Sequence, residues 1–287
     1  MRGKFVTFGL ILGMVAGVSG AQVPRRTTVD PTAMYCSGAV TSDAVPQDSY
    51  VISGEQSVDK VGFVAGQLVY INRGSGQGVK VGDEFLVIRS VKDELKEPWF
   101  KGQDELLRAM GRTWADEGRL KVVHVGDKVS TAEVKSTCDY IQRGDVVLPF
   151  QERPAPPLKQ DAQVVDQFAP ATGKTGMIVA SKYFGQASGS SSIVYVNIGA
   201  SQGVRVGSYL RVFRNQGRGV ATIYQDKGTE YKLFGFGSTP VAYEWPGLPR
   251  EILGEGIVLR VSGNTATLML TDVRREIYQG DYVELEQ

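Results

Sequence analysis

The sequence predicts a mainly β protein with two tandem small β-barrel modules and one short helix in the insertion of the first. Two observations lead to this prediction. The glycine-rich string VYINRGSGQGVKVGD at 69–83 returns at 194–208 as VYVNIGASQGVRVGS. A later block, 118–147, also aligns without gaps on 254–283. Because two separated blocks repeat in the same order, one module is duplicated along the chain.

The glycine-rich string encodes short strands separated by tight turns. Val69–Asn72 is β-branched and aromatic, as expected of a half-buried strand. A cluster of glycines follows, and glycine enters positive φ without a Cβ clash, which favours turns and bulges. A phosphate-binding loop is disfavoured, because no helical stretch follows the run and no Gly-Lys-Ser/Thr closes it. Structural turns are therefore predicted at Gly74, Gly78, Gly82, Gly144, Gly199, Gly203, Gly207 and Gly280.

The short strands and regular turn signals, with one insertion per copy, predict a closed or nearly closed barrel in each half. Closure leaves no long strand edge unpaired in such a small module. The predicted division is a signal peptide at 1–21, an extended or disordered leader at 22–47, the first module at 48–150, a proline-containing linker at 151–175 and the second module at 176–287.

The amino terminus predicts export. A basic start is followed by an apolar run from Phe5 to Val18 and then by small residues up to Ala21, which are the parts of a cleavable secretory signal peptide. The run is shorter than the roughly 20 residues of a membrane-spanning helix. No later stretch is long and apolar enough to span a bilayer, so the mature chain is expected to be periplasmic or extracellular, without a transmembrane segment.

The insertion of the first module, 91–117, predicts one short amphipathic helix. Its residues Leu106, Leu107 and Met110 recur at helical spacing. Strand character resumes at Gly118. The longer insertion of the second module, about 225–253, combines aromatic residues with glycines and prolines and predicts an ordered loop.

Cys36 and Cys138 are the only cysteines of the chain. In an exported protein an even count favours a disulfide, and two buried thiols are the alternative. Such a bridge would tether the leader to the first module, because the second repeat has Arg274 where the first has Cys138.

The string NRGSGQGVKVGDEFLVIR, with Gly144-Asp145 closing the same module, resembles the small β-barrel domain at the carboxyl end of flagellar assembly protein T and related bacterial envelope proteins. The matching residues are Asn72, Gly74, Gly78, Val79, Gly82 and Asp83, and then Asn197, Gly199, Gly203, Val204 and Gly207. Ser208 departs from the usual Asp. The tail LPREILGEGIVLRV is similar to exported proteins of which some carry a lysin-motif peptidoglycan-binding domain. The resemblance implies a structural or adaptor role in the envelope.

Groups that could carry catalysis are few. The chain has 32 Lys and Arg against 31 Asp and Glu, with no concentrated basic field, which argues against nucleic-acid binding. His124, the only histidine, lies in an alternating strand without a nucleophile motif, so a solvated histidine is expected. One His and two distant Cys do not make a zinc site. The pairs Asp104-Glu105 and Asp116-Glu117 are interpreted as solvated charges beside the helix. No enzyme activity, cofactor or metal is predicted.

Aromatic residues in the two insertions are the candidate partner-binding residues: Trp99, Phe100, Trp114, Phe234, Tyr243 and Trp245. Aromatic side chains on loops bury much area at small entropic cost. The alternative is that they cap the barrels as ordinary core. We expect an exported, non-enzymatic envelope scaffold or assembly protein that binds another envelope protein or peptidoglycan. A carbohydrate-binding module or a glycan-processing hydrolase is the alternative.

Overall fold

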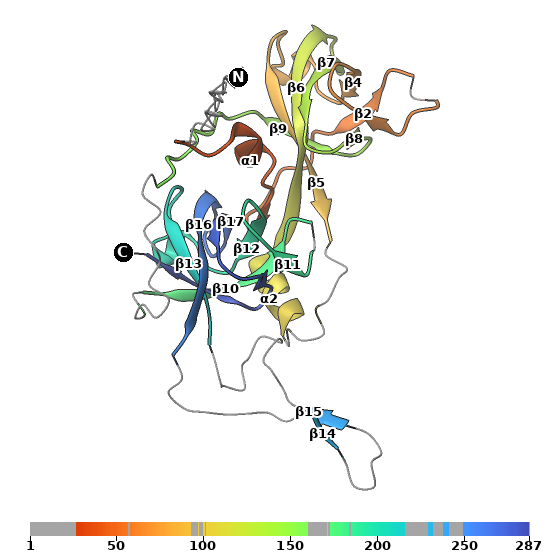
Figure 1. Cartoon of the computed structure of the whole chain (residues 1–287). Helices are drawn as coiled ribbons and strands as arrows, with labels where there is room; N and C mark the ends of the chain where they lie inside the picture. The colour runs from red at the N-terminus through yellow and green to blue at the C-terminus, as the bar shows by residue number, and fades with distance from the viewer. Residues whose placement is uncertain are drawn as a thin grey trace, which may run out of the picture.

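The computed structural model describes residues 27–56, 58–92, 97, 100, 102–159, 171, 173–183, 185–215, 229–231, 238–240 and 249–286. The chain is mainly β, as predicted, with two barrels one after the other (Figure 1). The predicted signal peptide and the candidate residues Trp99, Phe234, Tyr243 and Trp245 lie outside the described residues.

The first barrel has the strand order β2-β4-β7-β6-β5-β9. Its elements are β2 (Val51–Gly54), β3 (Gly62–Phe63), β4 (Leu68–Ile71), η1 (Ser75–Gln77), β5 (Glu84–Val91), α2 (Gln103–Met110), β6 (Arg112–Val125), β7 (Ser130–Thr137), β8 (Ile141–Gln142) and β9 (Val146–Pro149). Backbone pairing of Tyr50 with Val146 joins the two ends of this order. The hydrogen bond from Val147 N to Ser49 O, at 2.8 Å, supports the closure.

The second barrel is closed in the order β10-β12-β17-β16-β13-β19, which is the order of the first barrel strand for strand. Its elements are β10 (Thr175–Ser181), β11 (Ala187–Ser188), β12 (Ile193–Val196), η2 (Ala200–Gln202), β13 (Tyr209–Arg214), β16 (Glu251–Val261), β17 (Ala266–Val273), β18 (Ile277–Tyr278) and β19 (Tyr282–Leu285). Its insertion contributes the paired strands β14 (Thr229–Tyr231) and β15 (Ser238–Pro240). The predicted duplication of a β barrel is therefore confirmed.

The glycine-rich string forms a turn that packs closely against the hairpin between the last long strands of each barrel. Gly78 and Gly203 end the short helices η1 and η2 with φ of 81° and 91°, a backbone conformation that glycine favours. A Cβ on Gly74 would lie 2.3 Å from the Gly126 carbonyl oxygen. The predicted turn residues Gly82, Gly144, Gly207 and Gly280 also have positive φ.

An Arg–Asp pair that sequence reasoning missed closes each barrel in the same way. Arg89 of β5 donates from Nε and Nη2 to the two carboxylate oxygens of Asp145, at 2.7 and 2.8 Å. Arg214 of β13 makes the same two bonds to Asp281, both at 2.7 Å. Such two-point pairs are among the strongest polar contacts in proteins. The repeated Gly-Asp turns thus supply both a backbone bend and a buried acceptor.

The leader differs from its prediction. It contains the helix α1 (Pro31–Tyr35), which was not predicted, and one short extended strand, β1 (Ala39–Thr41). Asp30 caps the helix by accepting from Thr32 N at 2.7 Å. Strand β1 pairs antiparallel with β6, which begins at Arg112 and thus before the predicted start at Gly118. The sequence did not predict β1, because this pairing joins residues distant in sequence and leaves no local periodic pattern.

The first part of the linker is extended and lies beside the leader. Val29 N donates to Pro156 O at 3.1 Å, and Leu158 N donates to Thr27 O at 2.8 Å. The predicted short helix is confirmed as α2, which lies against the second barrel and not against its own (Figure 1). The part of the chain that the structure describes contains no helix with the length and apolarity to cross a membrane.

Candidate functional site

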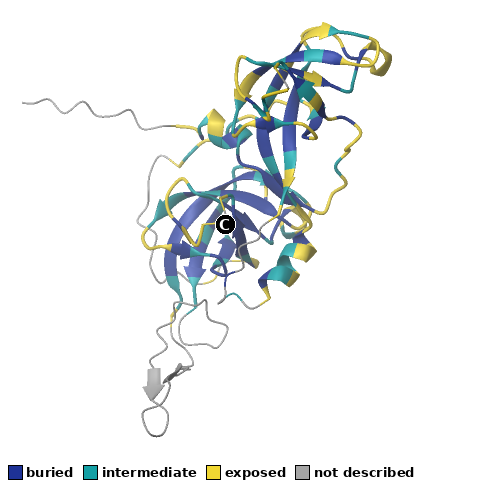
Figure 2. Cartoon of the chain, turned by 90° about the vertical axis from the view of Figure 1, so that its right-hand side faces the viewer, coloured by how far each residue is buried: buried dark blue, intermediate teal, exposed yellow. Residues whose placement is uncertain are grey.

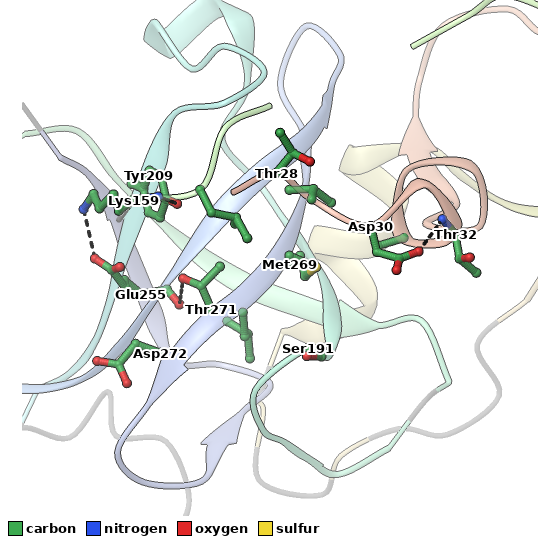
Figure 3. A pocket seen from close by; sticks show the side chains of 14 residues that line it. Thr28, Asp30, Thr32, Lys159, Ser191, Tyr209, Glu255, Met269, Thr271 and Asp272 are labelled. Atoms are coloured by element: carbon green, nitrogen blue, oxygen red, sulfur yellow. Dashed lines mark hydrogen bonds and ion pairs between the residues drawn. The ribbon is translucent and has the colours of Figure 1, made fainter. Parts of the chain in front are cut away.

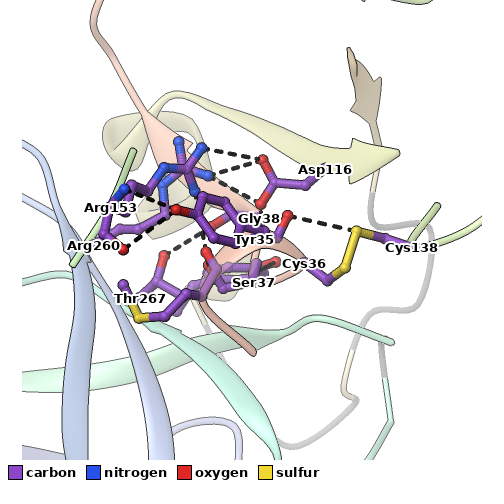
Figure 4. Close-up of polar contacts among 11 residues, drawn as sticks. Tyr35, Cys36, Ser37, Gly38, Asp116, Cys138, Arg153, Arg260 and Thr267 are labelled. Atoms are coloured by element: carbon purple, nitrogen blue, oxygen red, sulfur yellow. Dashed lines mark hydrogen bonds and ion pairs between the residues drawn. A yellow bond between two sulfur atoms is a disulfide. The ribbon is translucent and has the colours of Figure 1, made fainter. Parts of the chain in front are cut away.

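The junction between the barrels is held by a disulfide. Cys36, at the end of α1, is bonded to Cys138, just after β7, with a Cα–Cα distance of 5.4 Å. The predicted bridge between leader and first barrel is confirmed. It fixes the end of α1 to the residue that follows β7 (Figure 4).

Asp116 is the buried acceptor at the centre of this junction. Its side chain is 1% exposed, so the interpretation of Asp116 as a solvated charge is wrong. It accepts from Gly38 N at 2.8 Å and from Arg260 Nη1 at 3.1 and 3.2 Å, and Arg153 lies at 3.9 Å (Figure 4). A buried carboxylate requires such partners, since burial without them is costly. The leader, the linker and the second barrel thus meet on one side chain of the first barrel.

Three hydroxyl groups of the second barrel donate to the backbone of the leader. Tyr195 OH donates to Ser37 O at 3.0 Å, and Thr267 Oγ1 donates to Gly38 O at 3.1 Å. Thr265 Oγ1 donates to Val40 O. Burial raises the pKa of Tyr195, which keeps this phenol protonated as a donor. The second barrel therefore holds the leader segment 37–40 through the carbonyl groups of that segment.

Helix α2 completes the junction from the other side. Gln103 Nε2 donates to Val179 O at 2.9 Å, and Met110 packs in one cluster with Val40 and Tyr195. The candidate residue Phe100 is half-buried against this same cluster. Asp104 and Glu105 lie in the first turn of α2, where carboxylates suit the positive end of a helix.

The candidate residue Trp114 lies in β6 and is buried with Leu86, Ile88 and Val146. Of the aromatic candidates within the described residues, Trp114 is therefore core and Phe100 belongs to the junction. Neither forms an open aromatic surface.

Glu117, the neighbour of Asp116, is also buried and not solvated as expected. Its Oε1 lies 3.5 Å from Arg89 Nη1, and its Oε2 has no hydrogen-bond partner among the described residues. Burial raises the pKa of Glu117 to about 7, although Arg89 opposes the shift. The ungapped repeat places Leu253 at the equivalent position of the second barrel. Reading both charges as flanks of the helix was wrong because they lie inside β6.

A cavity of about 600 Å³ lies between leader, linker and the outer surface of the second barrel (Figure 3). Glu255 of β16 and Asp272 of β17 are direct cross-strand partners in its wall. Lys159 Nζ lies 3.0 Å from Glu255 Oε2, and its backbone N donates to Tyr209 OH at 2.8 Å. Burial raises the pKa of Glu255, while Lys159 lowers it. The cavity wall carries more carboxylates, Asp30, Glu255 and Asp272, than cationic groups, of which Lys159 is the one among its lining residues.

The outer surface of the second barrel that faces the junction is called here the covered face. It consists of Val179, Ile193, Tyr195, Leu259 and Thr267, of which Tyr195 is 2% exposed. Leader and α2 cover it. Four of the five are fully buried, and Ile193 is half-buried.

The equivalent surface of the first barrel is called here the free face. Its residues are Ile52, Leu68, Tyr70, Val123 and Thr131, aligned one by one with the covered face. Tyr70 is 36% exposed, Ile52 39% and Val123 42%. Figure 2 shows the same contrast, with the second barrel mostly buried and more exposed positions on the first. Apolar side chains thus remain at the surface where the second barrel buries its own.

His124 is exposed on β6 next to the free face, as predicted. Its equivalent in the second barrel is Arg260, the partner of Asp116. Over the described ranges, no three His, Cys, Asp or Glu side chains gather closely enough to hold a metal ion.

A comparison of the chain with models of known protein families finds no match, and a search of curated proteins finds no significant relative.

Proposed function

We propose that this chain is an exported, non-enzymatic adaptor of the cell envelope that presents the free face of its first barrel to another envelope protein or to peptidoglycan. Export is supported by the signal-like residues 1–21. The resemblance of the repeated glycine string to a domain of flagellar assembly protein T supports a role in the cell envelope.

The observation that carries this proposal is the difference in exposure between two equivalent barrel faces. Tyr70, Ile52 and Val123 are each more than a third exposed, whereas Tyr195, Val179 and Leu259 are buried. Clustered apolar side chains at a surface mark interaction sites more often than singly scattered ones. The face lies on a barrel fixed by a disulfide and by the buried Asp116 contacts, and a rigid support lowers the entropic cost of binding.

The test uses purified chain with a photo-crosslinking amino acid at position 70 or, as a control, at the exposed Tyr183 of the second barrel. Envelope extract and isolated sacculi are the two targets. The proposal expects a defined product, or retention on sacculi, that depends on position 70 and is lost in Ile52→Asp. Equal labelling from both positions, or none from position 70, contradicts an adaptor role of the free face.

A second function, glycan binding or hydrolysis, is favoured by one observation, the Glu255–Asp272 pair in the cavity wall. Directly opposed residues in a sheet have Cβ atoms about 4.5–5.5 Å apart, and two carboxyl groups at short range are the machinery of retaining glycosidases. The contact of Lys159 with Glu255 argues against a free acid catalyst. Release of reducing ends from glycan strands by the wild type, abolished in Glu255→Gln and Asp272→Asn, would establish the hydrolase and refute a purely non-enzymatic role.

A further inference from the structure

We infer that the free face binds a short glycine-containing peptide segment of a partner protein, in the manner in which the covered face holds residues 37–40 of the leader. The inference rests on the proposed adaptor function and names the kind of partner that this surface fits.

The argument begins with a pair of hydroxyl donors. Tyr195 and Thr267 are cross-strand partners in β12 and β17, and they donate to the carbonyl groups of two consecutive leader residues. Tyr70 and Thr131 are cross-strand partners in β4 and β7 at the same register. The first barrel therefore retains the donor pair that, in the second, binds the carbonyl groups of the bend at Ser37 and Gly38, where Gly38 has a φ of 64°.

The surroundings of the donor pair are also retained. Ile52 and Val123 take the places of Val179 and Leu259, so apolar side chains flank both pairs. These side chains are 39% and 42% exposed in the first barrel and buried in the second. Covering them in a complex removes apolar area from water, which favours binding. The free face can thus bind a peptide through both hydrogen bonds and apolar contacts.

The geometry of the covered face defines what the peptide must contain. Gly38 passes so close to the tyrosine that a Cβ there would lie 2.6 Å from the Tyr195 hydroxyl oxygen. A ligand that docks in the same way needs glycine next to Tyr70. The leader sequence there is Ser-Gly-Ala-Val, residues 37–40, in which Gly38 has a positive φ and strand β1 begins at Ala39. A segment of small and β-branched residues with such a glycine bend fits the site.

Two differences indicate a reversible complex and not a permanent one. Lys121 and Glu133 replace Ile257 and Met269 at the edge of the face and pair across β6 and β7. Val129 replaces Thr265, which removes the third donor to the leader. Fewer bonds and a polar edge leave the face stable in water without an occupant, as an exchangeable binding site requires.

The experiment titrates the isotope-labelled full chain with a synthetic peptide of residues 35–42 carrying Ser in place of Cys36. The chain's own leader already occupies the covered face, so added peptide has only the free face to enter. We expect amide shifts around Ile52, Tyr70 and Thr131 at millimolar peptide. Replacing the peptide's glycine by Val should weaken binding at least about tenfold, because the backbone can no longer approach the phenol.

Variants assign the contacts. Tyr70→Phe and Thr131→Val should each weaken binding by roughly 2- to 10-fold through loss of one hydrogen bond, and Tyr183→Phe, an exposed tyrosine of the second barrel, should leave it unchanged. Thermal unfolding and dispersed spectra show that each variant is folded. Absence of shifts, shifts confined to another surface, or unchanged binding by both free-face variants overturns the inference.

Two outcomes separate this inference from the adaptor function. Sedimentation that reveals a dimer broken by Tyr70→Phe assigns the free face to a second copy and overturns peptide binding. Failure of the peptide while position 70 still crosslinks to envelope targets overturns the peptide mode alone and leaves the adaptor in place.

Discussion

The covered face and the free face have the same strands, the same register and the same Tyr–Thr pair, but opposite exposure. Tyr195 is 2% exposed and Tyr70 36%. The difference is due to which segments pack on each barrel, because the leader and α2 are attached to the first barrel and cover the second. The comparison teaches that the segments packed on a barrel decide which of its outer residues are exposed. Of two copies of one fold, the second can therefore hold the leader while the first keeps a surface open for binding.

The largest expected effect tests how the leader is kept on the covered face. Replacing Cys36 and Cys138 by Ser opens a closed loop with a sequence separation of 102 residues. The free energy of unfolding should fall by roughly 4 kcal/mol, since the unfolded chain regains loop entropy. Chemical denaturation measures the loss, and hydrogen exchange at β12 reports whether the covered face opens. A loss below about 1 kcal/mol would mean that the second barrel holds the leader unaided.

The next largest effect on the free energy of unfolding is expected at Gly38, where the leader passes Tyr195. Gly38→Ala should reduce the free energy of unfolding by about 3 kcal/mol, because positive φ and a close approach to Tyr195 both oppose a Cβ. Gly66→Ala is the matched control, since Gly66 also has positive φ but open space around its Cβ position. It should cost only about 1 kcal/mol. Equal losses would show that the leader does not press against the covered face.

Glu117 should make the stability of the first barrel depend on pH, whereas the second barrel has Leu253 at this position. Its pKa is raised from 4.5 to about 7 by burial, so between these values the folded state keeps a proton that the unfolded state has released. Its contribution to stability therefore decreases as pH rises through this window, by about 2 kcal/mol.

The check is denaturant unfolding at about pH 5 and about pH 8, for wild type and for Glu117→Leu, which copies Leu253 of the second barrel. The variant should lose this decrease. An unchanged pH profile in Glu117→Leu would assign the dependence to other groups.

The smallest effect compares the two tyrosines directly. Tyr195→Phe removes the buried donor to Ser37 O and should cost about 1 kcal/mol of unfolding free energy. Tyr70→Phe should change it by less than about 0.5 kcal/mol, since Tyr70 is partly exposed. Equal costs in denaturation would contradict the assignment of one covered and one free face.

Features with a local signal could be predicted from the sequence. The two barrels and their turn glycines followed from patterns in both copies, and α2 followed from the helical spacing of apolar residues in the first copy alone. Strand β1 did not, because a three-residue strand acquires its partner from β6 far along the chain. The Arg89–Asp145 contact could have been found, since Arg214 and Asp281 occupy the same positions in the second copy. The buried Asp116 and Glu117 had a signal too, as the repeat places Ile252 and Leu253 opposite them.

The two faces show the limit of such reasoning. Tyr70 and Tyr195 are identical residues in nearly identical strings, and their burial depends on long-range packing that neither string encodes. Only neighbouring positions carry a sequence signal of this difference in burial, because the first barrel has Lys121 and Glu133 where the second has Ile257 and Met269.

The leader also constrains the order in which this chain becomes compact. Its hydroxyl partners Thr265 and Thr267 lie 225 and 229 residues later in the sequence, so they are synthesised after the whole first barrel. Contacts of such long range form late, after the local pairings of each barrel. Cys138 becomes available much earlier, before any strand of the second barrel exists. The disulfide can thus attach the leader to the first barrel before the second barrel folds. The second barrel then completes its folding against a leader that is already in position.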